Sequence, residues 1–585
     1  MSASRLLTTL RWLTLATCVW VAGVCSAQNI ERYMPLDIGA QSPLVPDLPE
    51  AKLPEVAGDD RELVAALFAV VIVDDAEKVS KEPAIDELRG LHHDFDESNS
   101  LVYGHGVRKI VDRYLGQPVT LRRINQLARD IHLHYRKCKQ PIVDVLIPEQ
   151  RITGGVLHLV VIESRIGKVR VKPGDHFHCD QITRWIDCTV VGDRIYERNL
   201  ESDLFWLNQN PFRRVGVDFE KGTEPGTTDV IYEVNDVLPL RGYMGIDDTG
   251  VETLNYGRFF AGFTYGNLFG RDGTLGYQYT TDEDFALLKA HAVNYAVPIN
   301  RQWSTAGYAS WAKVGSDLGG GINQGGESWQ TGGGLSWHLI RGPLHHRSVT
   351  FGGDFKSTDN NLEFAGTTVA SSNADLFAFR AGFEDLQRFD GDQYYLFRWD
   401  TFVGPGGGLT SANSREAFQT IRPGSSPDFI YSRMFIERMV THEGLQLMAR
   451  TQGQLASERL LFSETLGLGG FDTLRGFDQR SYNADHGWIM NLELGPEAMR
   501  WDSNAQTRFL RMYGFVDMGN GYVADPVPGE NSYAYALSTG VGLRFQIADR
   551  WICRADYGHG LKDIDPSQRS SRLHFGVTWI PGKRP

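Results

Sequence analysis

Beyond its first 27 residues, the sequence has no long apolar run, few cysteines and no block of concentrated basic residues. A helix needs about eighteen to twenty apolar residues to cross a bilayer. The longest internal candidate, Leu63 to Val73, is too short, which argues against a helical membrane protein. The net charge of −13, with Lys and Arg spread along the chain, makes nucleic acid a poor partner.

The first residues have the composition of a secretory signal peptide. Arg5 and Arg11 supply positive charge, and an apolar stretch follows from Trp12 to Cys25. Small residues then precede position 28, so we expect residues 1–27 to be cleaved off during export.

Four cysteines remain after that cleavage: Cys138, Cys179, Cys188 and Cys553. An exported protein meets an oxidising compartment, which permits disulfides. The segment from Cys179 to Cys188 reads as a helix, in which nine steps of about 1.5 Å hold the ends roughly 13 Å apart. That distance exceeds the reach of a disulfide, and a bridge forms only if the helix is shorter. The pairing of these two cysteines therefore stays open.

The next part of the chain contains two small α/β modules. A proline-rich linker, residues 28–62, shows no helical pattern. Residues 63–163 and 164–238 then repeat one scheme of helix and strand patterns, the first copy being enlarged between residues 74 and 106. In the first module the patterns predict helices over 107–115 and 122–135, the latter capped by Thr120, and strands over 143–147 and 156–163. In the second they predict a strand over 166–171, helices over 182–186 and 198–207, and a hairpin of 215–220 with 228–234.

From residue 239 to the C-terminus, apolar side chains recur at every second position. Met512 and Val516 fall on one face of their segment, whereas Tyr513 and Asp517 fall on the other. One apolar and one polar face is what a lipid-facing wall around a wet lumen requires, and a closed sheet leaves no strand edge unsatisfied in lipid. We therefore predict a mainly β fold with an antiparallel transmembrane β-barrel of about sixteen strands over residues 239–585.

Two further points concern this barrel. The glycine-rich stretches 319–326 and 403–414 are expected to be surface loops. A soluble β-sandwich also fits the alternation, but it fits poorly with the export signal and the aromatic-rich strands.

Five short motifs occur in a fixed order along the chain. They are Leu146-Ile-Pro-Glu-Gln-Arg-Ile-Thr-Gly-Gly155, Asn208-Gln-Asn-Pro-Phe212, Gly266-Asn-Leu-Phe-Gly270, Gly469-Gly-Phe-Asp-Thr-Leu-Arg-Gly-Phe477 and Phe515-Val-Asp-Met-Gly519. Each is weak alone, and their order makes the set specific. Together they resemble the two-partner secretion transporters of the TpsB type (ShlB, FhaC and HecB), in the superfamily that includes the barrel-assembly protein BamA. The resemblance covers nearly the whole mature chain.

The resemblance implies a location and a pore lock. The two modules would be periplasmic POTRA domains ahead of a barrel in the bacterial outer membrane. The long sixth extracellular loop would fold back into the pore, where Arg475 at its tip would contact Asp517 on the inner wall. Gly476 would allow a tight turn and Phe477 would pack on the wall, with Leu474, Phe515 and Gly519 completing the two motifs. A glycine turn with a solvated arginine is the competing interpretation.

No residue pattern points to catalysis. We find no nucleophile beside a base, and no Gly-x-x-x-x-Gly-Lys-Ser/Thr phosphate loop. The segment His176-Phe-His-Cys179 and the acidic run 282–284 are interpreted as solvated loop residues rather than metal ligands. We therefore expect neither an enzyme nor a bound cofactor or metal.

These observations predict a pore that receives an unfolded exoprotein of the TpsA type through its POTRA domains. The other expected partners are outer-membrane lipid and, during biogenesis, the barrel-assembly machinery. A BamA- or TamA-like insertase is the main alternative, although two modules favour secretion, and a passive porin is a third. The short Pro-rich linker makes a pore-plugging helix doubtful, and the chain continues for six residues past Trp579, its last aromatic residue.

Overall fold

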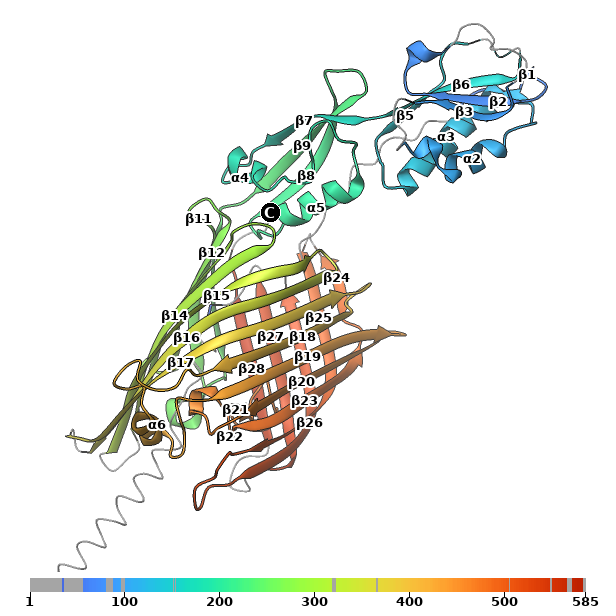
Figure 1. Cartoon of the computed structure of the whole chain (residues 1–585). Coiled ribbons are helices and arrows are strands. Elements are labelled where there is room, and N and C mark those ends of the chain that lie inside the picture. The colour runs from blue at the N-terminus through green and yellow to red at the C-terminus, as the bar shows by residue number, and fades with distance from the viewer. Residues whose placement is uncertain are drawn as a thin grey trace, which may run out of the picture. The chain divides into compact units, whose positions relative to one another are not determined.

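The computed structural model describes residues 34–35, 56–79, 88–95, 100–150, 152, 154–317, 322–364, 367–503, 506–547, 550–564 and 571–581. The expected signal peptide, residues 1–27, and most of the linker lie outside them. The chain divides into two compact units at Pro239, and each is described separately. Figure 1 shows both.

The first module is a four-stranded sheet in the order β3-β2-β6-β5, with two helices packed against it. Strand β2 pairs in parallel with both β3 and β6, and β5 is antiparallel to β6. A separate short pairing joins β1 to β4. The elements are β1 (Glu62–Val64), β2 (Ala69–Val73), β3 (Gly90–Asp94), α2 (His105–Asp112), β4 (Val119–Thr120), α3 (Leu121–Lys137), β5 (Val143–Leu146) and β6 (Val156–Glu163).

Local sequence explains where α3 begins and which face it buries. The side chain of Thr120 accepts a hydrogen bond from the backbone N–H of Arg123 at 3.2 Å, so Thr120 is the N-cap. Apolar residues recur at helical spacing, and Ile124, Leu127 and Ile131 are buried in the core of the module. Both predicted helices exist, but α2 ends at Asp112 rather than at residue 115. Strand β3 was missed within the stretch interpreted as an enlargement.

The second module has a three-stranded sheet in the order β7-β9-β8, with β7 parallel and β8 antiparallel to β9. Trp185 and Trp206 meet edge to face in its core, with ring centroids 5.3 Å apart. Phe212 of the Asn-Pro-Phe motif is buried in the same core, which gives that motif a packing role. The elements are β7 (Arg165–Lys172), α4 (Cys179–Thr183), α5 (Glu197–Leu207), β8 (Arg213–Lys221) and β9 (Thr227–Asp236).

The predicted helix over residues 182–186 was wrong in its bounds. Helix α4 begins at Cys179 and ends at Thr183, because a short turn at residues 184–185 follows it. Cys179 and Cys188 are not joined in a disulfide, and neither are Cys138 and Cys553.

Glu163, at the end of β6, joins the two modules. One carboxylate oxygen accepts hydrogen bonds from the Ser100 and Tyr135 hydroxyls, both at 2.7 Å. The other oxygen forms an ion pair with Arg194 of the second module at 2.9 Å, and both side chains are buried. Burial and the neighbouring Glu163 carboxylate raise the pKa of Tyr135. This shared carboxylate fixes one module against the other.

Asp203 on α5 organises the turn that follows α4. It is fully buried, and its carboxylate accepts hydrogen bonds from the backbone N–H groups of Asp187, Cys188 and Thr189 at 3.2, 3.1 and 2.9 Å. The Thr189 hydroxyl donates a further bond at 2.6 Å. With the Tyr232 hydroxyl, which donates at 3.3 Å, the carboxylate accepts hydrogen bonds from five donors in the module interior.

The second unit is a closed antiparallel barrel in which β10 pairs with both β11 and β28. Because β23 and β24 are two stretches of one strand, interrupted at Glu497 and Ala498, the barrel has sixteen strands, as predicted. The strands are β10 (Leu240–Asp247), β11 (Arg258–Leu268), β12 (Gly273–Asp282), β13 (Leu288–Pro298), β14 (Trp303–Asp317), β15 (Ile322–Arg341), β16 (His345–Phe364), β17 (Thr367–Arg388), β18 (Tyr394–Val403), β19 (Ile430–His442), β20 (Leu445–Ala456), β23 (His486–Pro496), β24 (Met499–Ser503), β25 (Gln506–Tyr522), β26 (Tyr533–Ile547), β27 (Trp551–Lys562) and β28 (Ser571–Trp579).

The predicted alternation matches the two faces of the wall. On β25, Met512 and Val516 are 42% and 36% exposed, whereas Tyr513 and Asp517 are 4% and 0% exposed. The expected loop at 319–326 was too long, because β15 begins at Ile322. The expected loop at 403–414 lies between β18 and helix α6 (Arg415–Ile421). No helix among the described residues is both long and apolar enough to span a membrane.

We predict that Asp203→Ala destabilises the second module locally. The substitution leaves buried donors without an acceptor, at about 1–3 kcal/mol for each such group, so we expect a loss of roughly 3 kcal/mol or more. Hydrogen–deuterium exchange of the full-length protein in detergent should show faster exchange across residues 187–207. The control, Asp218→Ala on the exposed face of β8, should leave exchange unchanged. Equal exchange in the two variants would contradict the assigned role of Asp203.

Candidate functional site: a loop held inside the barrel

The long connection between β20 and β23, residues 457–485, folds into the barrel and is called the crossing loop here. Its middle is a short hairpin of β21 (Leu466–Leu468) and β22 (Tyr482–Ala484). The tip of this hairpin carries the Leu-Arg-Gly-Phe sequence, residues 474–477. The predicted loop tip therefore projects from a paired stem.

The structure brings Arg475 and Asp517 together. The Arg475 side chain donates from Nε and Nη2 to the two oxygens of Asp517, at 2.8 and 2.7 Å. Its backbone N–H donates to the same carboxylate at 3.0 Å. Both side chains are almost completely buried, with 3% and 0% exposed. The contact is bidentate and directional, the geometry in which Arg–carboxylate pairs are strongest.

Two further carboxylates face the same guanidinium. Arg475 Nη1 donates to Glu493 on β23 at 2.7 Å and lies 3.5 Å from Asp556 on β27. Each of these acids has a second cation on the wall, since Arg511 lies 2.9 Å from Glu493 and Arg544 lies 2.8 Å from Asp556. One loop cation is therefore held within a wall network of alternating charge.

Aromatic and apolar contacts complete the part of the wall that holds the tip, which is called its seat. The Arg475 guanidinium lies 3.7 Å from the ring centroid of Phe515, a cation–π contact. Leu474 and Phe477 are buried in one apolar cluster with Ile489 of β23 and Ala536 of β26. The tip thus excludes water from the ion pair, which strengthens the charge interaction.

Glycines permit the backbone of the tip to lie directly on the wall. Gly476 has φ +106°, and a Cβ placed on it would lie 3.1 Å from the carbonyl carbon of Gly558 and 3.2 Å from the nitrogen of His559 on β27. A Cβ on Gly558 would in turn lie 2.5 Å from the Gly476 nitrogen. Any larger residue at either position would push the tip away from β27.

Other loop residues contact the neighbouring strands. Asp478 forms an ion pair with Arg572 on β28. Phe471 lies beneath the guanidinium of Arg554 on β27, 3.6 Å from it. The Thr473 carbonyl accepts a hydrogen bond from Asn491 on β23. The tip is therefore fixed to the wall formed by β23 to β28.

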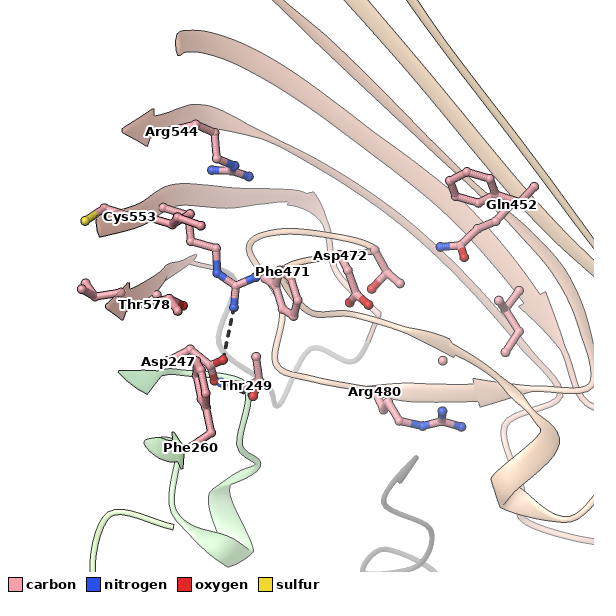
Figure 2. Close-up of a pocket in the computed structure, with 18 of the residues that line it drawn as sticks. Asp247, Thr249, Phe260, Gln452, Phe471, Asp472, Arg480, Arg544, Cys553 and Thr578 are labelled. Atoms are coloured by element: carbon pink, nitrogen blue, oxygen red, sulfur yellow. Dashed lines mark hydrogen bonds and ion pairs between the residues drawn. The ribbon is translucent and has the colours of Figure 1, made fainter. Parts of the chain in front are cut away.

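A cavity of about 800 Å³ remains beside the loop. Figure 2 shows Phe471 and Asp472 of the loop on one side of it, with Asp247 and Thr578 on the wall. The dashed line marks the ion pair of Asp247 with Arg554, 3.6 Å long. The loop thus lies beside an open cavity that is lined by charged, polar and apolar side chains.

Most of the seven predicted lock residues meet at this place. Arg475, Leu474, Gly476 and Phe477 form the seated tip, and Asp517 and Phe515 receive it. Gly519 stands apart from these contacts: it pairs with Ile489 and Ala536, and a Cβ on it would lie 2.9 Å from the Trp488 carbonyl oxygen.

Sequence reasoning missed Glu493 and Asp556. A signal for Glu493 was present, because alternation places Asn491 and Glu493 on one face of β23 and Leu492 and Leu494 on the other. Choosing Glu493 from among the inward polar residues required the pairing register.

The side chains that the sequence left as possible metal ligands form hydrogen bonds or ion pairs within the protein. His176 Nδ1 lies 3.3 Å from Asp236, whose carboxylate also accepts the backbone N–H groups of residues 175–177. Asp282 accepts the backbone N–H groups of Leu287 and Leu288, both at 3.0 Å. Over the described ranges, no group of three or more His, Cys, Asp or Glu side chains is arranged to hold a metal.

Comparison with protein family models shows to which family the chain belongs. The model described as haemolysin secretion/activation protein ShlB/FhaC/HecB matches residues 226–545, more than half of the chain. The chain belongs to this family. A second model, described as POTRA domain, ShlB-type, matches residues 94–164. The protein is thus an outer-membrane transporter of the TpsB type with periplasmic POTRA domains, as the motifs predicted.

Individual relatives agree with this family. The chain is 21% identical over 403 residues to the heme/hemopexin transporter protein HuxB of Haemophilus influenzae, covering 68% of this chain and 70% of that protein. The structure of CdiB from Escherichia coli aligns with a TM-score of 0.59 at 17% identity, over 94% of this chain and 95% of that one. BamA from Haemophilus ducreyi, lacking POTRA domains 1–3, aligns with a TM-score of 0.53 at 11% identity, over 80% and 95%. The two structures show a shared fold.

We predict that Arg475→Met frees the loop tip while the barrel stays folded. Removing one partner of a buried ion pair costs about 3–5 kcal/mol, so amide exchange over residues 469–481 should accelerate on the order of a hundredfold. The control is Arg500→Met, because the Arg500 side chain is 51% exposed in its ion pair with Asp392. Unchanged exchange at the tip in Arg475→Met would show that the ion pair does not hold the loop.

Proposed function

We propose that this protein recognises an unfolded partner exoprotein through its POTRA domains and moves it through the barrel to the cell surface without nucleotide hydrolysis. The observation that carries the proposal is the seated crossing loop: the lumen of a sixteen-stranded barrel, a size that leaves a channel, is occupied by a segment whose tip is held by one buried cation. Release of Arg475 from Asp517 would clear a path, and rebinding would close it.

The folds of the two modules support client capture. Among the described residues, β5 of the first sheet and β8 of the second each pair with a neighbour on one side only. Such an edge adds an extended segment through main-chain hydrogen bonds and tolerates varied client sequence. Leu146 on β5 is 49% exposed and offers an apolar contact beside that edge.

The drive for export is proposed to come from folding of the client outside the cell. The sequence contains no phosphate-binding Gly-x-x-x-x-Gly-Lys-Ser/Thr loop. A client that folds on the outer side cannot slide back through the pore, which makes the movement directional.

A second candidate, an outer-membrane insertase, is favoured by the seam between the first and last strands. Strand β10 pairs with β28 over four residues, 244–247 with 576–579, but with β11 over eight. Side chains supplement this short pairing: the Asp248 carboxylate accepts the Phe575 N–H at 2.9 Å and lies 2.8 Å from His574 Nδ1. A short ladder opens at lower cost than a long one.

We predict that Arg475→Ala blocks export without lowering the amount of barrel in the outer membrane. The proposed export cycle needs both release and rebinding of the tip, and a tip without its cation cannot rebind. Surface appearance of the partner exoprotein, measured by protease accessibility on whole cells, should fall at least about tenfold because the buried pair is lost. Heat-modifiable migration of the barrel is the control for folding. Normal export in this variant would contradict the lock.

Deleting the gene separates the two candidate functions. For a dedicated secretion pore, one large surface protein disappears while other outer-membrane barrels assemble normally. A general loss of outer-membrane barrels would instead support the insertase.

A further inference from the structure

The hairpin arm of the crossing loop, residues 466–484, is stiff. Its two strands pair at three successive positions, from Leu466 with Ala484 to Leu468 with Tyr482. Arg480 braces the stem, donating to the Thr465 hydroxyl at 2.7 Å and to Asn483 at 2.7 Å. The arm is therefore built to move as one piece.

Two buried carboxylates flank this arm at its base. Glu464 precedes β21 and is 1% exposed, and Asp485 directly follows β22 and is 0% exposed. Glu464 accepts a hydrogen bond from Lys356 Nζ at 2.9 Å and another from the Tyr431 hydroxyl. These two acids and their cations, Lys356 and Arg422, are called the base clamp.

Asp485 is held at several points. Arg422 donates to its two oxygens at 2.7 and 3.0 Å, and Arg422 is itself 1% exposed. The backbone N–H groups of Leu460 and Ala524 donate to the same carboxylate, both at 2.9 Å. The Arg422 guanidinium also donates to the Leu460 carbonyl at 2.6 Å. Asp485 thus ties together three separate stretches of the chain.

Glu464 at the base and Gly476 at the tip contact different parts of the wall, whereas Asp485 at the base also accepts the Ala524 N–H just after β25. Lys356 lies on β16, the seventh strand of the closed order, whereas Gly558 beneath the tip lies on β27, the fifteenth. In a barrel of sixteen strands, these strands are half a circumference apart. The loop therefore spans the lumen from one side to the other.

The tip and the base of the loop differ in the buried groups that would lose their partners if each left the wall. If the tip leaves, Glu493 keeps Arg511 and Asp556 keeps Arg544, and Asp517 retains a hydrogen bond from Asn491 at 2.8 Å. If the base leaves, Arg422 stays buried without its carboxylate, and two backbone N–H groups lose their acceptor. Release of the tip leaves Asp517 without a cation but with the Asn491 hydrogen bond, whereas release of the base leaves Arg422 and two backbone donors without their acceptor. Because the base loses more buried partners, we expect the tip to be the end that releases.

We propose that Glu464 and Asp485 are positioning residues that act through Arg475. Their ion pairs fix the base of the arm, the arm pivots there, and the tip returns to the same seat on β25 after each opening. This inference rests on the proposed function of the tip as the pore lock. It assigns the pivot to residues outside the motifs that identify the family.

The test compares base and tip variants of the full-length protein. Glu464→Gln and Lys356→Met are made singly, together, and each with Arg475→Met. Lys313→Met is the matched control, because it removes a lysine from an exposed ion pair with Glu327 on neighbouring wall strands. Single-channel recording in planar bilayers gives the dwell time of the closed state, and amide exchange reports on residues 466–484.

We expect each base variant to shorten the closed dwell time by about tenfold or more, because a buried ion pair is lost. The double variant should have the same closed dwell time as the single variants, because all three lose the same pair. The open-level conductance should match that of Arg475→Met, and base substitutions should add nothing in its presence. Amide exchange of the arm should rise in the base variants and stay unchanged in Lys313→Met.

Two outcomes would overturn the positioning role. One is normal closed dwell time and normal arm exchange in the base variants while Arg475→Met changes both. The other is a base variant whose effect adds to that of Arg475→Met, which would make the clamp an independent second lock. If Arg475→Met itself leaves conductance unchanged, the proposed lock fails, and arm exchange alone then decides whether Glu464 and Lys356 position the arm.

Discussion

Closure of the sheet is the constraint on which the rest of the structure depends. Inside lipid, each backbone N–H and C=O must find its partner within the protein, and a sheet satisfies this only when its last strand pairs with its first. Sixteen strands meet that requirement but leave an interior too wide for wall side chains to fill. Closure therefore satisfies the backbone hydrogen bonds but leaves an open lumen, called the hole below. The crossing loop occupies this hole.

The way in which the loop is held follows from the polarity of that interior. Inward-facing positions are polar because they line a wet lumen, so the wall supplies carboxylates and guanidiniums rather than an apolar core. Arg475 enters an existing network in which Glu493 and Asp556 already face Arg511 and Arg544. The loop adds one cation to a nearly balanced wall. This arrangement holds the tip firmly yet leaves the wall stable in its absence.

Features with a local or periodic signal were predictable from the sequence. The cap at Thr120, the inward position of Asp517 and the strand content of the barrel all follow from periods of 3.6 or two residues and from side-chain chemistry. The pairing of Arg475 with Asp517 was expected from the resemblance to the family. Its geometry could not be derived, because 42 residues separate the two side chains.

Features set by tertiary context were missed. The Asp485–Arg422 pair joins residues 63 positions apart that no motif marks. Strand β3 forms through parallel pairing with β2. Its own sequence, Gly-Leu-His-His-Asp, does not have the pattern of a strand. The backbone of residues 187–189, which follows α4, is held by Asp203 from another helix. In each case the deciding partner lies far away in sequence.

The carboxylate of Glu163, shared between the two periplasmic modules, has a consequence for recognition. Because it binds Ser100 and Tyr135 on one side and Arg194 on the other, the modules cannot swing freely about their junction. This shared carboxylate limits how far edge strands β5 and β8 can move relative to each other. An exported chain that engages both would have to present two adhesive stretches at a matching interval, so selection would act on the spacing of segments as well as on their composition.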